Sequence, residues 1–171
     1  PVVYFSQSGG QPWSSVPFGG GNISSSGCSV TSLSMVLSYL KSGTDKTGWI
    51  YPSDVVQKII EKTGNYNHFY AGAAGQGWGI FPAVAGYYGM KCKTISSSKI
   101  TEELASGHPV IMSCKPSEFT NGGHFIVLTG VTDDGYIVVN DPNSSHRDKS
   151  SRKYTQSYLS SVGKQWWSFS E

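Results

Sequence analysis

The sequence predicts an α+β protein with helices in the first part of the chain and an antiparallel sheet in the second. Residues 28–41 place apolar side chains three or four positions apart, among them Val30, Leu33 and Leu37, which is helical spacing. After about residue 110 the apolar residues form short runs separated by Gly, Asp and Asn, a pattern typical of strands. Elements grouped in this order are expected to pack as two layers on one core.

The N-terminal part is expected to open with a short strand in VVYFSQ, residues 2–7, followed by an irregular stretch rich in Gly, Pro and Ser. The helix over 28–41 comes next. Ser25 or Ser26 is its candidate cap, because a serine oxygen accepts a hydrogen bond from the unpaired N–H groups at a helix start.

A second helix is expected over 53–64, capped by Ser53 and ended by Gly64. The glycine-rich stretch over 71–79 reads as a loop. A short helix in IFPAVAGYYG, a strand in MKCKTI and a helix in SSKITEELASG complete this part of the chain.

The later part contains the strand-like runs PVIMSC, HFIVLTGVT, GYIVVND and KQWWSFS. The two middle runs are expected to form a hairpin, since the Asp-Gly pair between them suits the positive φ angles of a tight turn. A polar loop over 141–153 and a short helix over 155–161 lead to the last strand.

Composition narrows the class of protein. A chain of 171 residues favours a single domain spanning 1–171. The net charge of +2 comes without clustered Lys or Arg, so nucleic acid is not an expected partner. No apolar run approaches the roughly 20 residues that span a bilayer, so no membrane segment is expected.

Location is predicted from the surface and the start of the chain. Charged residues make up only 14%, so the surface depends on uncharged polar residues, which is more typical of an extracellular protein. The first residue is Pro1 rather than an initiating Met, as expected of a processed or excised form. We expect a monomer that is extracellular or associated with the cell wall.

The three cysteines, Cys28, Cys92 and Cys114, are far apart in the sequence. There is no Cys-x-x-Cys pair and no histidine at ligand spacing from a cysteine, so no metal site is expected. Their odd number leaves at least one thiol free. Cys92 and Cys114 fall in strand-like runs and are expected to pack as small apolar residues, with a disulfide between them left open.

Three residues at the ends of predicted elements carry the candidate chemistry. Cys28 lies in the first turn of its helix, where unpaired N–H groups and the positive end of the helix dipole stabilise a thiolate. His124 begins an apolar strand behind two glycines that let a ligand approach. Asp141 ends the next strand, before Pro142.

The predicted hairpin places His124 and Asp141 at the same open end. The carboxylate can accept one ring N–H of His124 and direct the other ring nitrogen towards a thiol. Taken singly, each residue has an ordinary explanation: Cys28 as core packing, His124 as a structural polar group, Asp141 as part of a turn. Together, in this order and at element ends, they favour a nucleophilic site.

The motifs YFSQ, SGCSVTSLSMVLSYL, GWGIFPAVAGYYGM, ELASGHPVIMS, GGHFIVLTGV and GYIVVNDPN span Tyr4 to Asn143. With them the chain resembles the bacterial cysteine peptidases related to the bacteriocin-leader (double-glycine) peptidases, within the wider papain-like group. The resemblance implies a papain-like fold and a Cys–His–Asp triad. Cys28 is then the nucleophile, His124 the general base and acid, and Asp141 the orienting carboxylate.

The resemblance also implies an upstream glutamine at the oxyanion hole. Gln7, which closes YFSQ, is preferred to Gln11 for this role. The chain departs from the family where many relatives read Cys-Gly-Pro and this sequence has Cys28-Ser29-Val30. The backbone there is less free, and the substrate preference is in question.

The predicted function is that of a secreted bacterial cysteine peptidase, hydrolysing amide bonds in cell-wall peptides or other extracellular polypeptides. The Cys28 thiolate attacks the carbonyl carbon, the Cys28 N–H and the Gln7 amide hold the oxyanion, and His124 protonates the leaving amine. No cofactor is required.

A peptide or peptidoglycan substrate is expected to meet Trp78 and Gly77 in the glycine-rich loop, together with Gly123 and Trp13. For the loop, an ordinary surface turn is an equally good interpretation. Three other functions stay open: a processing peptidase for a peptide precursor, an acyl- or peptidyl-transferase, and a catalytically silent peptide-binding module.

Overall fold

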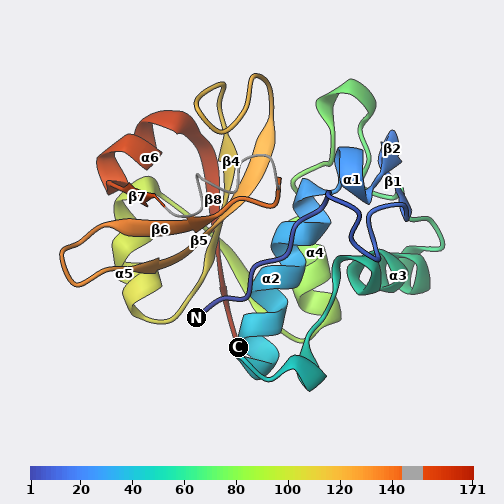
Figure 1. Ribbon diagram of the computed structural model, residues 1–171, viewed down its shortest axis with the longest axis horizontal. Helices are drawn as coiled ribbons and strands as arrows, with labels where there is room; N and C mark the ends of the chain where they lie inside the picture. Colours follow the sequence, from blue (N-terminus) through green and yellow to red (C-terminus); the bar gives the residue numbers. More distant parts are fainter. Residues whose placement is uncertain (144–151) are drawn as a thin grey trace.

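Six strands form one antiparallel sheet within residues 1–143 and 152–171, the parts of the chain that the computed structural model describes (Figure 1). The strand order is β3-β8-β4-β5-β6-β7. These strands are β3 (Lys91–Ile95), β4 (Val110–Cys114), β5 (His124–Val131), β6 (Ile137–Asn140), β7 (Lys153–Tyr154) and β8 (Gly163–Ser170). The two-residue strands β1 (Pro17–Phe18) and β2 (Gly21–Asn22) pair separately. Most of the polar loop predicted over 141–153 lies outside the described residues.

Six α-helices and three 3-10 turns accompany the sheet in the same described residues. The α-helices are α1 (Ile23–Ser26), α2 (Cys28–Ser42), α3 (Pro52–Thr63), α4 (Ile80–Tyr87), α5 (Ile100–Ala105) and α6 (Gln156–Val162). The 3-10 turns are η1 (Lys46–Gly48), η2 (Gly72–Ala74) and η3 (Ser97–Lys99). The helix expected in SSKITEELASG is therefore divided between η3 and α5.

The sheet is covered on both faces, so the prediction of two layers on one core is wrong. Helices α2, α3 and α4 lie on one side of the sheet and α5 and α6 on the other (Figure 1). Neighbouring residues of β5 enter different clusters: Val127 packs with α2, whereas Leu128 packs with α5. The central strands are apolar at nearly every position because both of their faces are buried.

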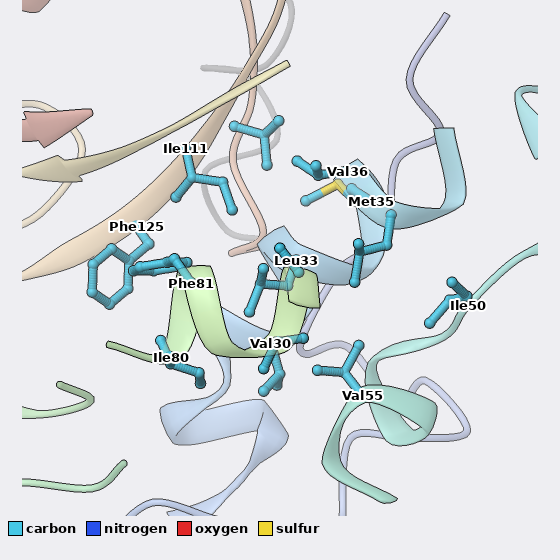
Figure 2. Close-up of a cluster of buried hydrophobic side chains, with 14 of the residues drawn as sticks. Val30, Leu33, Met35, Val36, Ile50, Val55, Ile80, Phe81, Ile111 and Phe125 are labelled. Atoms are coloured by element: carbon cyan, nitrogen blue, oxygen red, sulfur yellow. The ribbon is translucent and has the colours of Figure 1, made fainter. Parts of the chain in front are cut away.

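Helix α2 forms the centre of the larger core. Its Val30, Leu33 and Val36 are fully buried. Figure 2 shows them between Val55 of α3, the side chains of α4, and the sheet residues Ile111 and Phe125. This packing fixes α2 against the sheet and thereby fixes the position of Cys28 at its first turn.

The N-terminal segment departs from its prediction. Residues 2–7 form no strand; they pass the end of β6 and make isolated hydrogen bonds there. The Asn140 side chain donates to the Val3 carbonyl at 3.2 Å, and the Gln7 N–H donates to the Pro142 carbonyl at 2.8 Å. Since β6 ends at Asn140, no continuous ladder is available to this segment.

The caps of the first two long helices also differ from prediction. Ser25 and Ser26 lie inside α1, and α2 begins directly after Gly27 without a side-chain cap. Helix α3 starts at Pro52 rather than Ser53, with Asp54 accepting the Tyr51 N–H at 2.8 Å. Its predicted end is confirmed, because Gly64 adopts the left-handed conformation with φ of 79°.

Candidate active site

Cys28 is the first residue of α2, directly after the short helix α1. Gly27 makes this junction possible: its N–H donates to the Ile23 carbonyl at 2.9 Å, and a Cβ there would lie 2.6 Å from the same oxygen. Only a residue without a side chain fits so close to the preceding turn. The N–H groups of the first turn of α2 therefore surround Cys28 without partners inside the helix.

His124 and Asp141 meet at the open end of the hairpin, as the sequence predicts. His124 Nε2 lies 2.7 Å from Asp141 Oδ1. The Asp141 carboxylate is fully buried, and the same Oδ1 also accepts the Asn143 N–H at 3.0 Å, so two hydrogen bonds fix its orientation. With Nε2 engaged by the carboxylate, Nδ1 is the ring nitrogen left for the thiol.

His124 is hydrogen-bonded to Asp141 and lines the same pocket as Cys28, and both residues act on its pKa. Burial alone would lower the pKa of His124, since it disfavours the charged ring. The hydrogen bonds with Asp141 and Cys28 and the charges of both outweigh burial and raise this pKa to about 10. The site therefore favours an imidazolium beside the sulfur, the state in which a cysteine attacks and a histidine donates a proton.

Cys28 and His124 open into a pocket of about 680 Å³, which we call the Cys28 pocket. This volume lies in the range of clefts that bind small ligands. The lining residues are Gly20, Ser25, Ser26, Cys28, Tyr70, Gly72, Ala73, Ala74, Gly75, Gln76, Trp78, Ser113, Gly123, His124, Phe125 and Lys164.

The residues predicted to bind substrate are divided by the structure. Trp78 and Gly123 line the Cys28 pocket, and the Trp78 indole is 44% exposed. Gly77 lies between two lining residues, and its N–H donates to the Phe69 carbonyl at 2.6 Å. Trp13 does not line the pocket: it is buried, and its Nε1 donates to the Ser6 carbonyl at 2.8 Å.

Trp13 is thus a core residue rather than a wall of the groove. It stacks on Tyr51 with ring centres 5.5 Å apart. A tryptophan between Pro and Ser gives no sequence signal that separates these two environments.

Gln7 lies near the site but is not brought into the pocket. Its amide Nε2 donates to the carbonyl oxygens of Ser24 at 3.0 Å and Ile23 at 3.4 Å. These bonds hold the N-terminal segment against α1, four to five residues before Cys28. The oxyanion role predicted for Gln7 stays a prediction, whereas the N–H groups at the start of α2 are placed beside the sulfur.

Two polar residues of the Cys28 pocket are ones that sequence reasoning missed. Gln76 is only 8% exposed, and its Oε1 is buried without a hydrogen-bond partner. It is held in the pocket wall by the small hairpin that pairs Tyr70 with Gln76. Lys164 comes from β8, far along the chain, and only the folded sheet shows that it faces the site.

The three cysteines are all free, so Cys92 and Cys114 form no disulfide. Within residues 1–143 and 152–171, no group of three or more His, Cys, Asp or Glu is arranged to hold a metal ion. Among the same residues, no helix combines the length and apolar character needed to cross a membrane.

Comparisons with known proteins give a family and a fold. The sequence model of the Peptidase_C39 like family matches residues 1–170. No curated protein matches the sequence. Among solved structures, the chain is similar to the peptidase domain of Streptococcus ComA, a bi-functional ABC transporter involved in a quorum-sensing pathway. The identity is 12% and the TM-score 0.56, over 84% of this chain and 90% of that one.

These findings confirm the family resemblance carried by the sequence motifs. They also confirm the predicted fold class, α+β and papain-like, with N-terminal helices packed on an antiparallel sheet.

Proposed function

This chain belongs to the Peptidase_C39 like family, and we propose that it hydrolyses peptide bonds through Cys28, His124 and Asp141. The observation that carries the proposal is the hydrogen bond between His124 and the buried Asp141, with Cys28 and His124 lining one pocket. A nucleophile beside a base that a carboxylate orients is the arrangement that covalent catalysis needs, and these residues support it.

In the first half of the reaction, the Cys28 thiolate attacks the carbonyl carbon of the scissile peptide bond. The carbonyl π pair moves to oxygen, and the backbone N–H of Cys28 at the start of α2 stabilises the resulting oxyanion. The oxyanion then collapses, the C–N bond breaks, and the imidazolium of His124 gives its proton to the leaving amine. The products are a Cys28 thioester and a free amine.

In the second half, neutral His124 takes a proton from water, and the hydroxide attacks the thioester carbonyl. The C–S bond breaks, the acid is released, and the thiolate and imidazolium are restored. Asp141 does not change its own protonation; it keeps the ring oriented and stabilises the charged imidazolium.

The natural substrates we propose are cell-wall peptides or other extracellular polypeptides, for an enzyme secreted by a bacterium. Support comes from the low fraction of charged residues and from a pocket lined by an exposed tryptophan and several glycines, which suits an extended peptide. Processing of a peptide precursor is the second candidate, because the similar domain of ComA is a peptidase within a transporter that acts in quorum sensing.

The decisive experiment compares Cys28→Ala with Cys92→Ala on a mixed peptide library, with cleavage products identified by mass spectrometry. Cys28→Ala is expected to lose roughly a thousandfold or more in rate while keeping its circular dichroism spectrum and melting temperature. Cys92→Ala, a partly buried thiol outside the site, should cleave at the wild-type rate. Undiminished cleavage by Cys28→Ala would rule the mechanism out.

A further inference from the structure

Lys164 occupies an irregular position in the sheet beside the site. In the pairing of β4 with β8, Ser113 is opposite Gln165 and Cys114 is opposite Gly163. One residue of β8 is therefore left over, and it is Lys164. A bulge of this kind interrupts the regular alternation of a strand and redirects a side chain, a device common next to active sites.

The neighbours of the bulge bring Lys164 to the catalytic residues. Cys114 pairs with His124 on its other side, so His124 and Gly163 flank the same residue of β4. Lys164 lines the Cys28 pocket together with Ser113 and Phe125.

The charge of Lys164 stands out in its surroundings. Among the described residues, it is the one Lys, Arg, Asp or Glu that lines the Cys28 pocket. No carboxylate of the described chain forms an ion pair with it, although Lys58, Lys93, Lys99 and Lys153 all have such partners. The pocket therefore presents a lysine ammonium, without an ion-pair partner among the described residues, on the same wall as Cys28 and His124.

The pocket that Lys164 lines also contains the aromatic side chains of Trp78 and Phe125. Trp78 packs edge-on against Trp167 of β8 with ring centres 5.3 Å apart. Phe125 of β5 is the residue paired with Ser113 of β4. An aromatic surface with an ammonium group at its margin suits a side chain that has a short aliphatic stem and a terminal carboxylate. A carboxylate partly removed from water by these rings gains more from the cation than an exposed pair would.

We propose that Lys164 makes the peptidase selective for substrates that carry an acidic residue, Glu or Asp, at one position close to the scissile bond. The inference rests on the proposed function, since it names the substrate class of the same pocket. It assigns Lys164 to substrate binding and leaves the chemical steps to the triad.

The test uses a peptide library prepared from a digested bacterial proteome, with the position of every cleavage read by mass spectrometry. For the wild type, Glu and Asp should be enriched over Gln and Asn at one position, by about tenfold in relative kcat/KM. In Lys164→Gln this enrichment should vanish, and in Lys164→Glu it should turn into a preference for Lys and Arg.

Lys62→Gln, on the exposed face of α3, is the matched control and should keep the wild-type profile. Raising the salt concentration should weaken the acidic preference, because Lys164 is exposed and dissolved ions screen the attraction between solvent-exposed charges. Equal cleavage of acidic and neutral sequences by the wild type, or an acidic preference that survives in Lys164→Gln, would overturn the proposal.

A binding measurement separates this inference from the proposed function. Peptides of the same library are captured on Cys28→Ala and on Cys28→Ala/Lys164→Gln, and the bound fractions are sequenced. Acidic peptides should be enriched on the first protein only. If the wild type cleaves no peptide, enrichment of acidic peptides on the first protein would still support the role of Lys164. If both proteins capture acidic peptides equally, the role of Lys164 is refuted, even when the wild type is an active peptidase.

Discussion

At the scale of single residues, the site depends on how His124 holds its proton. Its ring is largely buried, yet its hydrogen bonds with Asp141 and Cys28 raise its pKa to about 10. The imidazolium is thus retained through neutral pH, where the proposed mechanism needs a cationic partner for the sulfur and a proton donor for the leaving amine.

This raised pKa predicts a pH profile. The proton on His124 is lost as the pH rises through its pKa, so kcat/KM should hold from neutral pH to about pH 9 and fall near pH 10. Asp141→Asn removes a carboxylate that raises this pKa, and the alkaline limb should move to lower pH. Steady-state rates on one peptide, measured at steps of about half a pH unit, would test this. If kcat/KM of Asp141→Asn falls at the same pH as that of the wild type, a group other than His124 controls the alkaline limb.

The three thiols should differ sharply in reactivity. Burial raises the pKa of Cys92 to about 12 and that of Cys114 well above its usual range, whereas Cys28 has the His124 imidazolium as a partner. Near pH 6 an ordinary thiol, with a pKa of about 8.5, is almost wholly protonated. A short pulse of iodoacetamide at that pH should therefore alkylate Cys28 first, as read by peptide mass mapping.

His124→Ala is the control for this labelling, because it removes the imidazolium and should slow the reaction of Cys28. Asp141→Ala should slow it less. Equal labelling of all three cysteines, or reaction of Cys28 only on unfolding, would favour the silent peptide-binding module over the peptidase.

At the scale of elements, the junction between α1 and α2 places Cys28, the proposed nucleophile. Gly27 has a φ of −98°, so its conformation is open to any residue; what requires glycine is space. Its Cβ would meet the Ile23 carbonyl at 2.6 Å and the Ile23 Cγ2 at 2.7 Å. Neither backbone nor a branched side chain yields easily, so α2 must shift to make room.

Gly27→Ala is therefore expected to lower stability by about 1–3 kcal/mol and to reduce kcat, because the Cys28 sulfur moves relative to His124. Gly86→Ala in α4 is the matched control. A Cβ there meets nothing within 4 Å, so the helix should gain about 0.5–1 kcal/mol instead. Denaturant unfolding and steady-state kinetics measure both effects. Equal results for the two variants would contradict the steric role of Gly27.

The elements also show which parts of the fold and of the site can be predicted from sequence patterns. The hairpin of β5 and β6 was predictable, and with it the meeting of His124 and Asp141, because pairing of neighbouring strands is local. The place of Lys164 in the site could not be predicted, since it depends on a bulge between strands about 50 residues apart in the sequence. Ser53 was a reasonable cap, yet Pro52 starts α3 one residue earlier because its fixed φ suits a first helical turn.

At the scale of the whole molecule, the sheet separates two apolar clusters. One contains α2 and α4 and supports the site; the other contains α5 and α6 on the far face. Alternation along β5 shows the division, with Val127 in the first cluster and Leu128 in the second. The sequence hides this arrangement, because a run such as HFIVL is apolar throughout and does not tell which face meets which helix.

The last prediction concerns whether these clusters unfold together, as one domain over 1–171 requires. Leu128→Ala should cost about 3 kcal/mol, because it leaves a cavity in a fully buried position on the face away from Cys28. If the sheet couples both faces, the variant should still unfold in one transition, coincident by far-ultraviolet circular dichroism and tryptophan fluorescence. Trp166 and Trp167 report on opposite faces of β8, so the fluorescence follows both clusters. Below its melting temperature the variant should retain wild-type kcat, since none of the residues around Cys28 is altered. Two separate transitions, or a loss of activity before the main unfolding step, would show that the far cluster is an independent unit.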